Sequence, residues 1–372
     1  MTSTENNHDG SDRKNTGGPS RWIRDLFGSD LQRTFHRDVK ALYGFYIDEE
    51  RRRELAQMNS VKRFFMLLGW MFKSLYGKLS PVRQLMLVIS LALILWGNHT
   101  FAAGGIRISL NLTQIGALLL LLILMLELKD KLLARDELEV GRAVQLSLLP
   151  EHNPDLPGWE IWLYTEPAND VGGDLVDYLE TGPDRLSLIL GDVSGKGLGA
   201  ALLMAKLQAT VRALAAERPT MVDLGRRINE IFCRDGLPGR FATMVYLELL
   251  AGTATVRLLN AGHIPPVVIR HDRLDVFSPV ALPMGILADT TFQDQATDLQ
   301  AGDVLLLYSD GVTEATNDAL ELYDDDRLFN MLPQLRPFPP ETIGRRILES
   351  VNAFVQDAPR SDDLSMIILK KL

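Results

Sequence analysis

Residues 186–198 read LSLILGDVSGKGL, an apolar run that ends in an aspartate and continues into glycines. Residues 304–314 repeat the pattern as VLLLYSDGVTE, and residues 361–369 reverse it as SDDLSMIIL. Short apolar runs bounded by glycine and aspartate are typical of buried β-strands. The three segments therefore predict three buried strands, each with an aspartate at one end.

The rest of residues 151–372 contains further short strands and paired helices. Strands are expected at 159–164, 186–190, 242–249, 254–259, 267–270, 304–308 and 364–369, and helices at 199–217, 221–234, 325–335 and 340–356. Several strands follow one another directly, which an alternating parallel-sheet fold does not allow. The pattern predicts an α+β fold with sheets covered by helices.

The aspartates at the strand ends are the candidate chemical groups. They are Asp192, Asp310, the Asp362–Asp363 doublet, and Asp174 in the glycine-containing segment VGGDLVDY. Any one of these segments alone reads as a turn, but four together indicate a carboxylate cluster that cations must neutralise. Oxygen ligands select Mg²⁺ or Mn²⁺, and a single cysteine excludes a cysteine-rich zinc site. Two such ions activate water and neutralise a phosphoryl oxygen, which favours phosphate ester hydrolysis without a covalent enzyme intermediate.

Six motifs occur in the order found in one known family. They are QLSLLP, PANDVGGD, GDVSGKGLGAALLMA, NAGHIPP, LLLYSDGVTEATN and SDDLSMIIL. In these motifs the chain resembles bacterial serine phosphatases of the SpoIIE/RsbU type, a branch of the metal-dependent protein phosphatase 2C superfamily. The resemblance covers roughly residues 138–372 and not the first 130. It implies an αββα four-layer sandwich with two metal ions, Mn²⁺ or Mg²⁺, at one edge between the sheets.

The resemblance also implies roles for individual residues. Asp192 is expected to bridge both ions, Asp174 and the carbonyl of Val193 to hold one, and Asp310 with Asp362 to hold the other, with Asp363 as the alternative to Asp362. Asp192 and Asp310 are the expected catalytic residues, and a metal-bridging hydroxide is the expected nucleophile. The implied substrate is phosphoserine or phosphothreonine on an anti-anti-sigma protein.

Two basic side chains near the motifs have open roles. Eukaryotic members carry a histidine just after the bridging aspartate, where this chain has Ser194-Gly195-Lys196. Lys196 either contacts phosphate or is solvated. His263 in NAGHIPP is expected to be a structural histidine braced by a turn, with action near the site as the alternative.

The first 128 residues are net basic, whereas the rest of the chain is net acidic. Residues 1–128 hold 16 Lys and Arg against 11 Asp and Glu, whereas residues 129–372 hold 23 against 37. The acidic second part argues against nucleic acid as a partner. The runs 81–103 and 106–128 are candidate membrane spans, and a buried helical hairpin is the alternative. Basic residues flank the outer ends of both runs, which places both ends in the cytoplasm.

These observations divide the chain into five parts: a disordered tail at 1–20, a cytoplasmic or interfacial helical region at 21–80, two transmembrane helices at 81–128, a linker helix at 129–150 and a phosphatase domain at 151–372. Residues 61–76 mix aromatic residues with lysine, which fits either an interfacial helix or an ordinary amphipathic one.

The linker has two interpretations of its own. No proline interrupts residues 113–149, so a single helix is expected to run to Pro150. Its apolar stripe fits either a homodimeric coiled coil or packing on the following domain. Together the features predict a multi-pass inner-membrane phosphatase with a cytoplasmic catalytic domain. The competing class is a catalytically silent phosphatase-like module that relays a membrane signal through partner binding.

Overall fold

The computed structural model describes residues 59–103, 106–182, 184–217, 219–237 and 239–372. The predicted tail at 1–20 and most of the region 21–80 lie outside these residues. The chain divides into two compact units, Met1–Lys129 and Asp130–Leu372.

The second unit contains two five-stranded antiparallel sheets. One has the strand order β10-β7-β6-β5-β4 and the other the order β3-β12-β11-β8-β9. The bounds are β3 Trp159–Glu166, β4 Leu175–Gly182, β5 Arg185–Val193, β6 Ala242–Leu250, β7 Thr255–Ala261, β8 Val267–Ile269, β9 Leu274–Val276, β10 Gln295–Asp298, β11 Val304–Tyr308 and β12 Leu364–Lys371.

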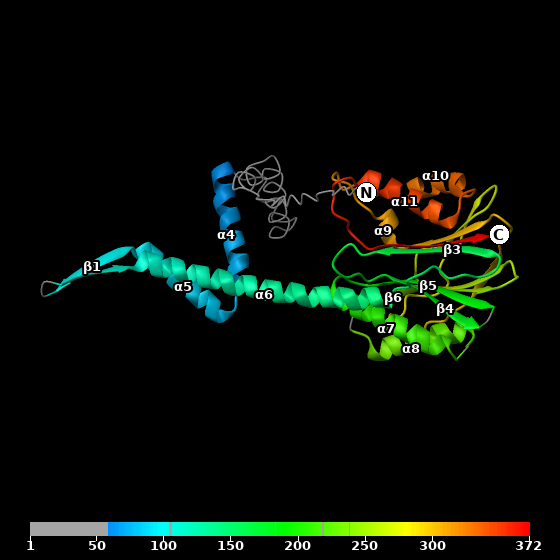
Figure 1. Cartoon of the computed structure of the whole chain (residues 1–372), viewed down its shortest axis with the longest axis horizontal. Coiled ribbons are helices and arrows are strands. Elements are labelled where there is room, and N and C mark those ends of the chain that lie inside the picture. The colour runs from blue at the N-terminus through cyan, green and yellow to red at the C-terminus, as the bar shows by residue number, and fades with distance from the viewer. Residues whose placement is uncertain (1–58, 104–105, 183, 218, 238) are drawn as a thin grey trace, which may run out of the picture. The chain divides into compact units, whose positions relative to one another are not determined.

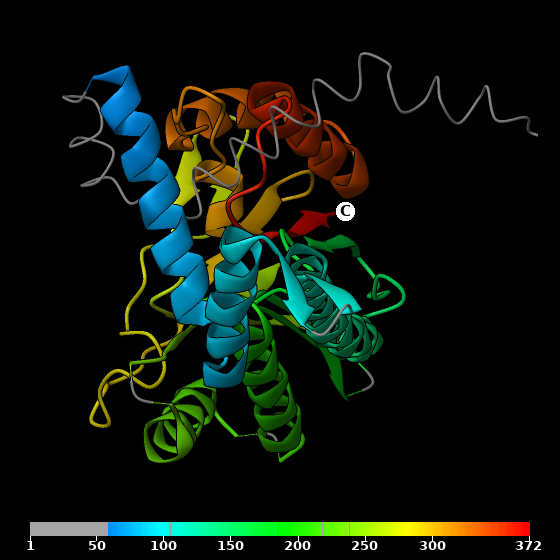
Figure 2. The same cartoon turned by 90° about the vertical axis from the view of Figure 1, so that its left-hand side faces the viewer.

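Two helix pairs cover the outer faces of these sheets (Figure 1). Helices α7 (Leu198–Ala215) and α8 (Met221–Asp235) pack on the β5 sheet, and α10 (Asp325–Leu335) and α11 (Pro340–Val355) on the β11 sheet. Figure 2 shows the same pairs on opposite sides of the sheets. The predicted α+β class and αββα sandwich are thus confirmed.

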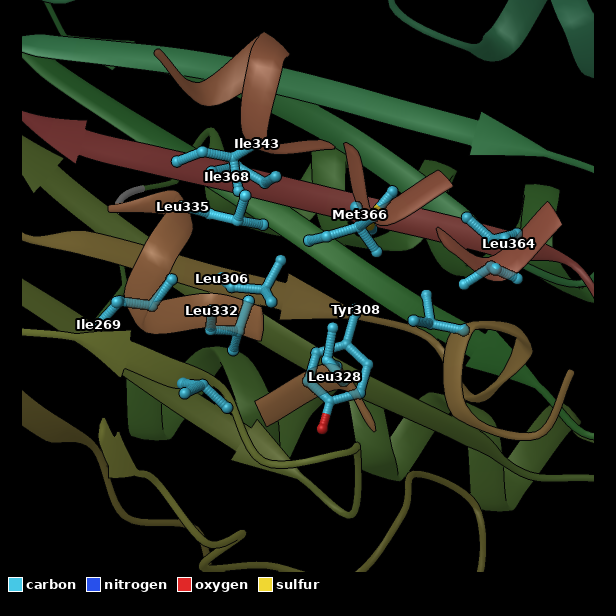
Figure 3. Close-up of a cluster of buried hydrophobic side chains, with 14 of the residues drawn as sticks. Ile269, Leu306, Tyr308, Leu328, Leu332, Leu335, Ile343, Leu364, Met366 and Ile368 are labelled. Carbon is cyan, nitrogen blue, oxygen red and sulfur yellow. The ribbon is translucent and has the colours of Figure 1, made fainter. Parts of the chain in front are cut away.

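Successive side chains of the central strands point to opposite faces of a sheet that is buried on both faces, which explains the continuous apolar runs in the sequence. In β11, Leu305 and Leu307 face the core between the sheets, whereas Leu306 and Tyr308 face the helices. Figure 3 shows Leu306 and Tyr308 beside Leu332 and Leu328 of α10. Because both faces of the strand are buried, neither set of positions is polar.

The predicted elements of this unit agree with the structure to within three residues at each end. The strand β4 was not predicted, because Asp177 and Glu180 interrupt its apolar pattern. Asp177 is fully buried and paired with Arg212, whose Nε and Nη2 donate to its carboxylate at 2.8 and 2.7 Å. This charge is accommodated only by a partner on α7. The short strands β9 and β10 and the helix α9 (Asp310–Thr313) were also not predicted.

The first unit contains α4 (Ser60–Lys78), α5 (Pro81–Trp96) and a β-hairpin of β1 (Asn98–Ala103) and β2 (Ile106–Asn111). The helix α6 (Leu112–Leu148) then runs across the boundary between the units, which confirms the predicted uninterrupted helix. Both predicted spans are corrected, since strands replace helix at residues 98–103 and 106–111. Asn98 and Asn111 pair at the base of the hairpin, and Gly97 ends α5 with a positive φ of 75°.

The apolar helices α5 and α6 pack on each other at a small residue. Ser90 Oγ donates to the Gly116 carbonyl at 2.8 Å, and a Cβ on Gly116 would lie 2.7 Å from Ile94 Cγ1. Arg83 and Glu127 form an ion pair at 2.6 Å near the other end of the contact. Two described helices, α6 and α7, are long and apolar enough to cross a membrane, but α7 belongs to the core of the second unit.

Candidate metal centre

Three predicted aspartates come together from both sheets. Asp192 lies near the end of β5, Asp310 begins α9 directly after β11, and Asp362 precedes β12. With Glu314 they line one pocket of about 400 Å³. The other lining residues are Val193, Ser194, Gly195, Lys196, Phe241, Thr243, Gly262, His263 and Ile264. The edge of the sandwich thus collects four carboxylates around one cavity.

The carboxylates disfavour one another's charged form. Burial, followed by the charges of Asp192, Asp362 and Glu314, raises the pKa of Asp310 to about 7. Burial and the charges of Asp362 and Asp363 raise the pKa of Asp192 to about 6. A group of carboxylates with raised pKa values is stabilised in its charged form by cations.

Asp174 lies beside this pocket without lining it. Its carboxyl is buried, its Oδ2 has no hydrogen-bond partner, and burial with the charge of Asp192 raises its pKa well above the usual range. Gly173 brings the segment close, because a Cβ there would lie 3.0 Å from the Val193 carbonyl and 3.4 Å from Asp192 Oδ1. The backbone of VGGD therefore packs against the Asp192–Val193 segment.

The two residues of the doublet face different surroundings. Asp362 lines the pocket, and its Oδ2 lies 3.0 Å from Lys196 Nζ. Asp363 is buried and accepts backbone hydrogen bonds from Ala168 (2.8 Å), Gly173 (2.5 Å) and, more weakly, Asp174 (3.4 Å). Asp363 thus fixes the segment that carries Asp174. Sequence alone cannot distinguish two adjacent aspartates, because their roles depend on which face of the chain each one occupies.

His263 is buried in the pocket wall. Its Nδ1 lies 2.8 Å from Thr243 Oγ1, and its own backbone N–H donates to Asn260 Oδ1 at 2.8 Å. Burial lowers the pKa of His263 to about 4, so the ring is neutral near pH 7. These contacts agree with the expectation of a structural histidine held by its turn.

Gln145 was not predicted as part of the site. This residue of α6 makes two hydrogen bonds with the backbone of Gly172, beside Gly173 and Asp174. The available sequence signal was the position of Gln145 at the start of the QLSLLP motif. The last turn of α6 therefore contacts the acidic site within the second unit.

The donors of the pocket fit divalent cations. Among the described residues, no three acidic, histidine or cysteine side chains converge on one point as they stand. Mg²⁺ needs only one or two protein carboxylates beside water, and the oxygen-only donor set with a buried unpartnered Asp174 Oδ2 suits such an ion. Asp174, Asp192, Asp310, Asp362 and the Val193 carbonyl are the groups available to hold it.

A family model identifies this part of the chain. The model described as Stage II sporulation protein E (SpoIIE) matches residues 182–371. The chain belongs to the SpoIIE family. The matched segment contains Asp192, Asp310 and Asp362, whereas Asp174 precedes it.

Three named proteins are similar in sequence to this SpoIIE-family chain. It is 27% identical to Protein IcfG of Synechocystis sp. over 65% of this chain and 42% of that protein. It is 28% identical to Phosphoserine phosphatase RsbP of Bacillus subtilis over 64% of this chain and 59% of that protein. Phosphoserine phosphatase RsbU of the same organism is 24% identical over 64% of this chain and 70% of its own length. The chain thus matches about half the length of the first two relatives.

Solved structures support the fold. The SiaA-PP2C domain of Pseudomonas aeruginosa is 17% identical, with a TM-score of 0.56 over 65% of this chain and 98% of that one. The PP2C phosphatase domain and regulatory fragment of SpoIIE from Bacillus subtilis is 20% identical, with a TM-score of 0.50 over 57% and 62%. The SpoIIE-family region therefore has the PP2C fold.

Proposed function

We propose that this protein is a metal-dependent serine/threonine protein phosphatase. The observation that carries the proposal is the single pocket that Asp192, Asp310, Glu314 and Asp362, contributed by both sheets, line together. Membership in the SpoIIE family and similarity to two proteins named phosphoserine phosphatase support the same activity.

Two Mn²⁺ or Mg²⁺ ions are the proposed cofactors. Asp192 would contribute to both ions, Asp174 and the Val193 carbonyl to one, and Asp310 with Asp362 to the other. We choose Asp362 over Asp363 because Asp362 lines the pocket, whereas the carboxylate of Asp363 accepts the backbone N–H groups of Ala168, Gly173 and Asp174. Bound cations of this kind neutralise phosphoryl oxygens and lower the pKa of water. Asp192, Asp310 and Asp362 line the pocket that would receive the phosphate ester.

The substrate we propose is a phosphorylated regulatory protein of the anti-anti-sigma type. Support comes from the RsbU and RsbP likeness together with the family motifs. A phosphoproteome comparison between cells with and without this chain tests it, and the expected result is one small protein whose phosphoserine persists.

Hydrolysis itself is tested with the full chain purified in detergent. With Mn²⁺ it is expected to release phosphate from a phosphoserine peptide, and Asp192→Asn and Asp310→Asn each to reduce turnover at least 100-fold (roughly the scale of losing one electrostatic stabiliser). Asp289→Asn is the matched control, since Asp289 is an exposed acid of the same unit. Turnover retained in both site variants contradicts the metal assignment. Absence of turnover and of calorimetric Mn²⁺ binding in the wild type favours the silent signalling module.

We further propose that the apolar helix α5 and residues 112–128 of α6 anchor the chain in the inner membrane, with the catalytic unit in the cytoplasm. Residues 112–128 of α6 are apolar, and their side chains are mostly exposed. The helix α5 has 16 residues, about 24 Å at 1.5 Å per residue and shorter than the ~30 Å hydrocarbon core. Retention in the membrane pellet after alkaline carbonate extraction is the expected result, and release contradicts the anchor.

The linker part of α6 is proposed to pair with a second copy of the chain. Leu132, Leu133, Val140 and Val144 are at least half exposed, whereas Gln145 and Leu149 face the VGGD segment. The helix end thus packs on its own domain while the preceding turns remain available for a coiled coil. Oxidative crosslinking of Leu133→Cys in a Cys233→Ser background is expected to yield a dimer, and monomers alone contradict the pairing.

A further inference from the structure

Arg240 is held against the rim of the acidic pocket. Its Nη1 donates to the Ser194 carbonyl at 2.6 Å. The next residue, Phe241, fixes the same segment, because its N–H donates to Ser194 Oγ at 2.9 Å and its carbonyl accepts from the Ser194 N–H at 2.9 Å. Ser194 and Phe241 both line the pocket.

The guanidinium also lies directly over Gly195, another lining residue. A Cβ on Gly195 would lie 1.3 Å from Arg240 Nη1, and its φ of +105° is one that side chains rarely adopt. Glycine at this position therefore permits the arginine to approach the backbone of the pocket rim.

Among the basic side chains that the structure describes near the pocket, Lys196 is paired with a carboxylate and Arg240 is not. Lys196 is the basic residue among those that line it, and it pairs with Asp362 at 3.0 Å and donates to the Ser361 carbonyl. Within the described part of the chain, Arg240 has no carboxylate partner, and its one side-chain acceptor is the Ser194 carbonyl. A guanidinium has five N–H donors, so the bond to Ser194 leaves donors for an anion next to four carboxylates that would otherwise repel it.

We propose that Arg240 binds the phosphate group of the substrate at the mouth of the acidic pocket. The proposal rests on the phosphatase function proposed above and adds a substrate-binding residue to it. Arginine suits this role because its planar fork can hold two phosphate oxygens at once, and it keeps its charge at any working pH. The bond to Ser194 holds that fork in place before the substrate arrives.

The test uses the full chain in detergent with Mn²⁺, with Arg240→Gln, Arg240→Lys and Arg226→Gln as variants. Arg226 is an exposed arginine on α8 paired with residues of its own helix, Asp223 and Glu230, and is the matched control. With p-nitrophenyl phosphate as substrate and inorganic phosphate as inhibitor, Arg240→Gln is expected to raise KM and the phosphate inhibition constant about tenfold. For Arg240→Lys, both constants are expected to lie between those of the wild type and Arg240→Gln. For Arg226→Gln, both are expected to match the wild type.

Measurements of Mn²⁺ affinity and thermal unfolding distinguish phosphate binding by Arg240 from a purely structural role of this residue. Both are expected to be unchanged in Arg240→Gln. A loss of Mn²⁺ affinity equal to the loss of phosphate affinity, or an unchanged phosphate inhibition constant, overturns the proposal. If the wild type does not hydrolyse the substrate, the phosphatase function fails, and calorimetry with inorganic phosphate still decides. Equal phosphate binding by wild type and Arg240→Gln, including none by either, overturns the role of Arg240.

Discussion

Gln145 binds Gly172 through both groups of its side-chain amide. Nε2 donates to the Gly172 carbonyl at 2.8 Å, and the Gly172 N–H donates to Oε1 at 3.0 Å. Gly172 precedes Gly173 and Asp174, so one side chain of the linker helix holds the backbone of the segment that carries a proposed metal ligand. This contact links α6 to the acidic site through two hydrogen bonds and two peptide units.

Removal of this contact is expected to loosen the VGGD segment. Gln145→Leu leaves the buried N–H and carbonyl of Gly172 unpaired, which costs about 1–3 kcal/mol in the free energy of unfolding. Amide hydrogen exchange at residues 172 and 173 is expected to accelerate. Ser147→Ala is the control, because Ser147 is exposed on the same helix and bonds only within it. Equal exchange in wild type and Gln145→Leu would show that other contacts hold the segment.

The aspartate doublet is expected to separate stability from activity. Asp363→Ala removes the acceptor of three backbone N–H groups and is expected to lower the free energy of unfolding by about 3 kcal/mol, the scale of breaking a buried charged network. Asp362→Ala is expected to change stability little while it reduces Mn²⁺-dependent turnover. Chemical denaturation beside a phosphatase assay measures both quantities, and the reverse pattern would exchange their roles.

Asp310 is expected to destabilise the metal-free protein. Its charge is repelled by Asp192, Asp362 and Glu314. Asp310→Asn is therefore expected to raise the free energy of unfolding of the metal-free protein by about 1–3 kcal/mol at pH 8, after allowance for solvent screening, and with it the thermal midpoint. Mn²⁺ is expected to raise the midpoint of the wild type more than that of the variant. Differential scanning calorimetry with and without Mn²⁺ checks this, and an equal response of both proteins argues against Asp310 as a ligand.

His263 is expected to make the stability depend on pH. Its pKa is about 4 in the fold against 6.5 ordinarily, so the unfolded chain binds a proton that the folded chain does not between these values. The associated stability is present above pH 6.5 and is lost as the pH falls toward 4, by at most about 3 kcal/mol.

The aspartates with raised pKa values act in the opposite direction, so the comparison must be with His263→Asn. The difference in unfolding free energy between wild type and His263→Asn is expected to shrink from pH 7 to pH 4. Urea denaturation across that range measures it. A difference that stays constant with pH would show that the ring is protonated alike in both states.

The local pattern of the sequence determined most of the second unit. Apolar runs such as 304–308 predict buried strands whatever surrounds them, because their burial on both faces leaves no polar position. Asp192 and Asp310 were found for the same reason, since each interrupts the chain where an apolar strand ends. The sequence also predicts the uninterrupted helix α6, because no proline occurs between residues 113 and 149.

Tertiary structure decided what depends on residues distant in the chain. Strand β4 accommodates the charge of Asp177 because Arg212 and Gln208 of α7 both donate to its carboxylate. Asp363 differs from Asp362 only because the VGGD segment, some 190 residues earlier, presents its N–H groups to one of them. Arg240 reaches the pocket rim through Ser194 and Gly195. Local pattern records which face of an element is apolar, whereas hydrogen bonds between distant segments form only once the sheets have packed.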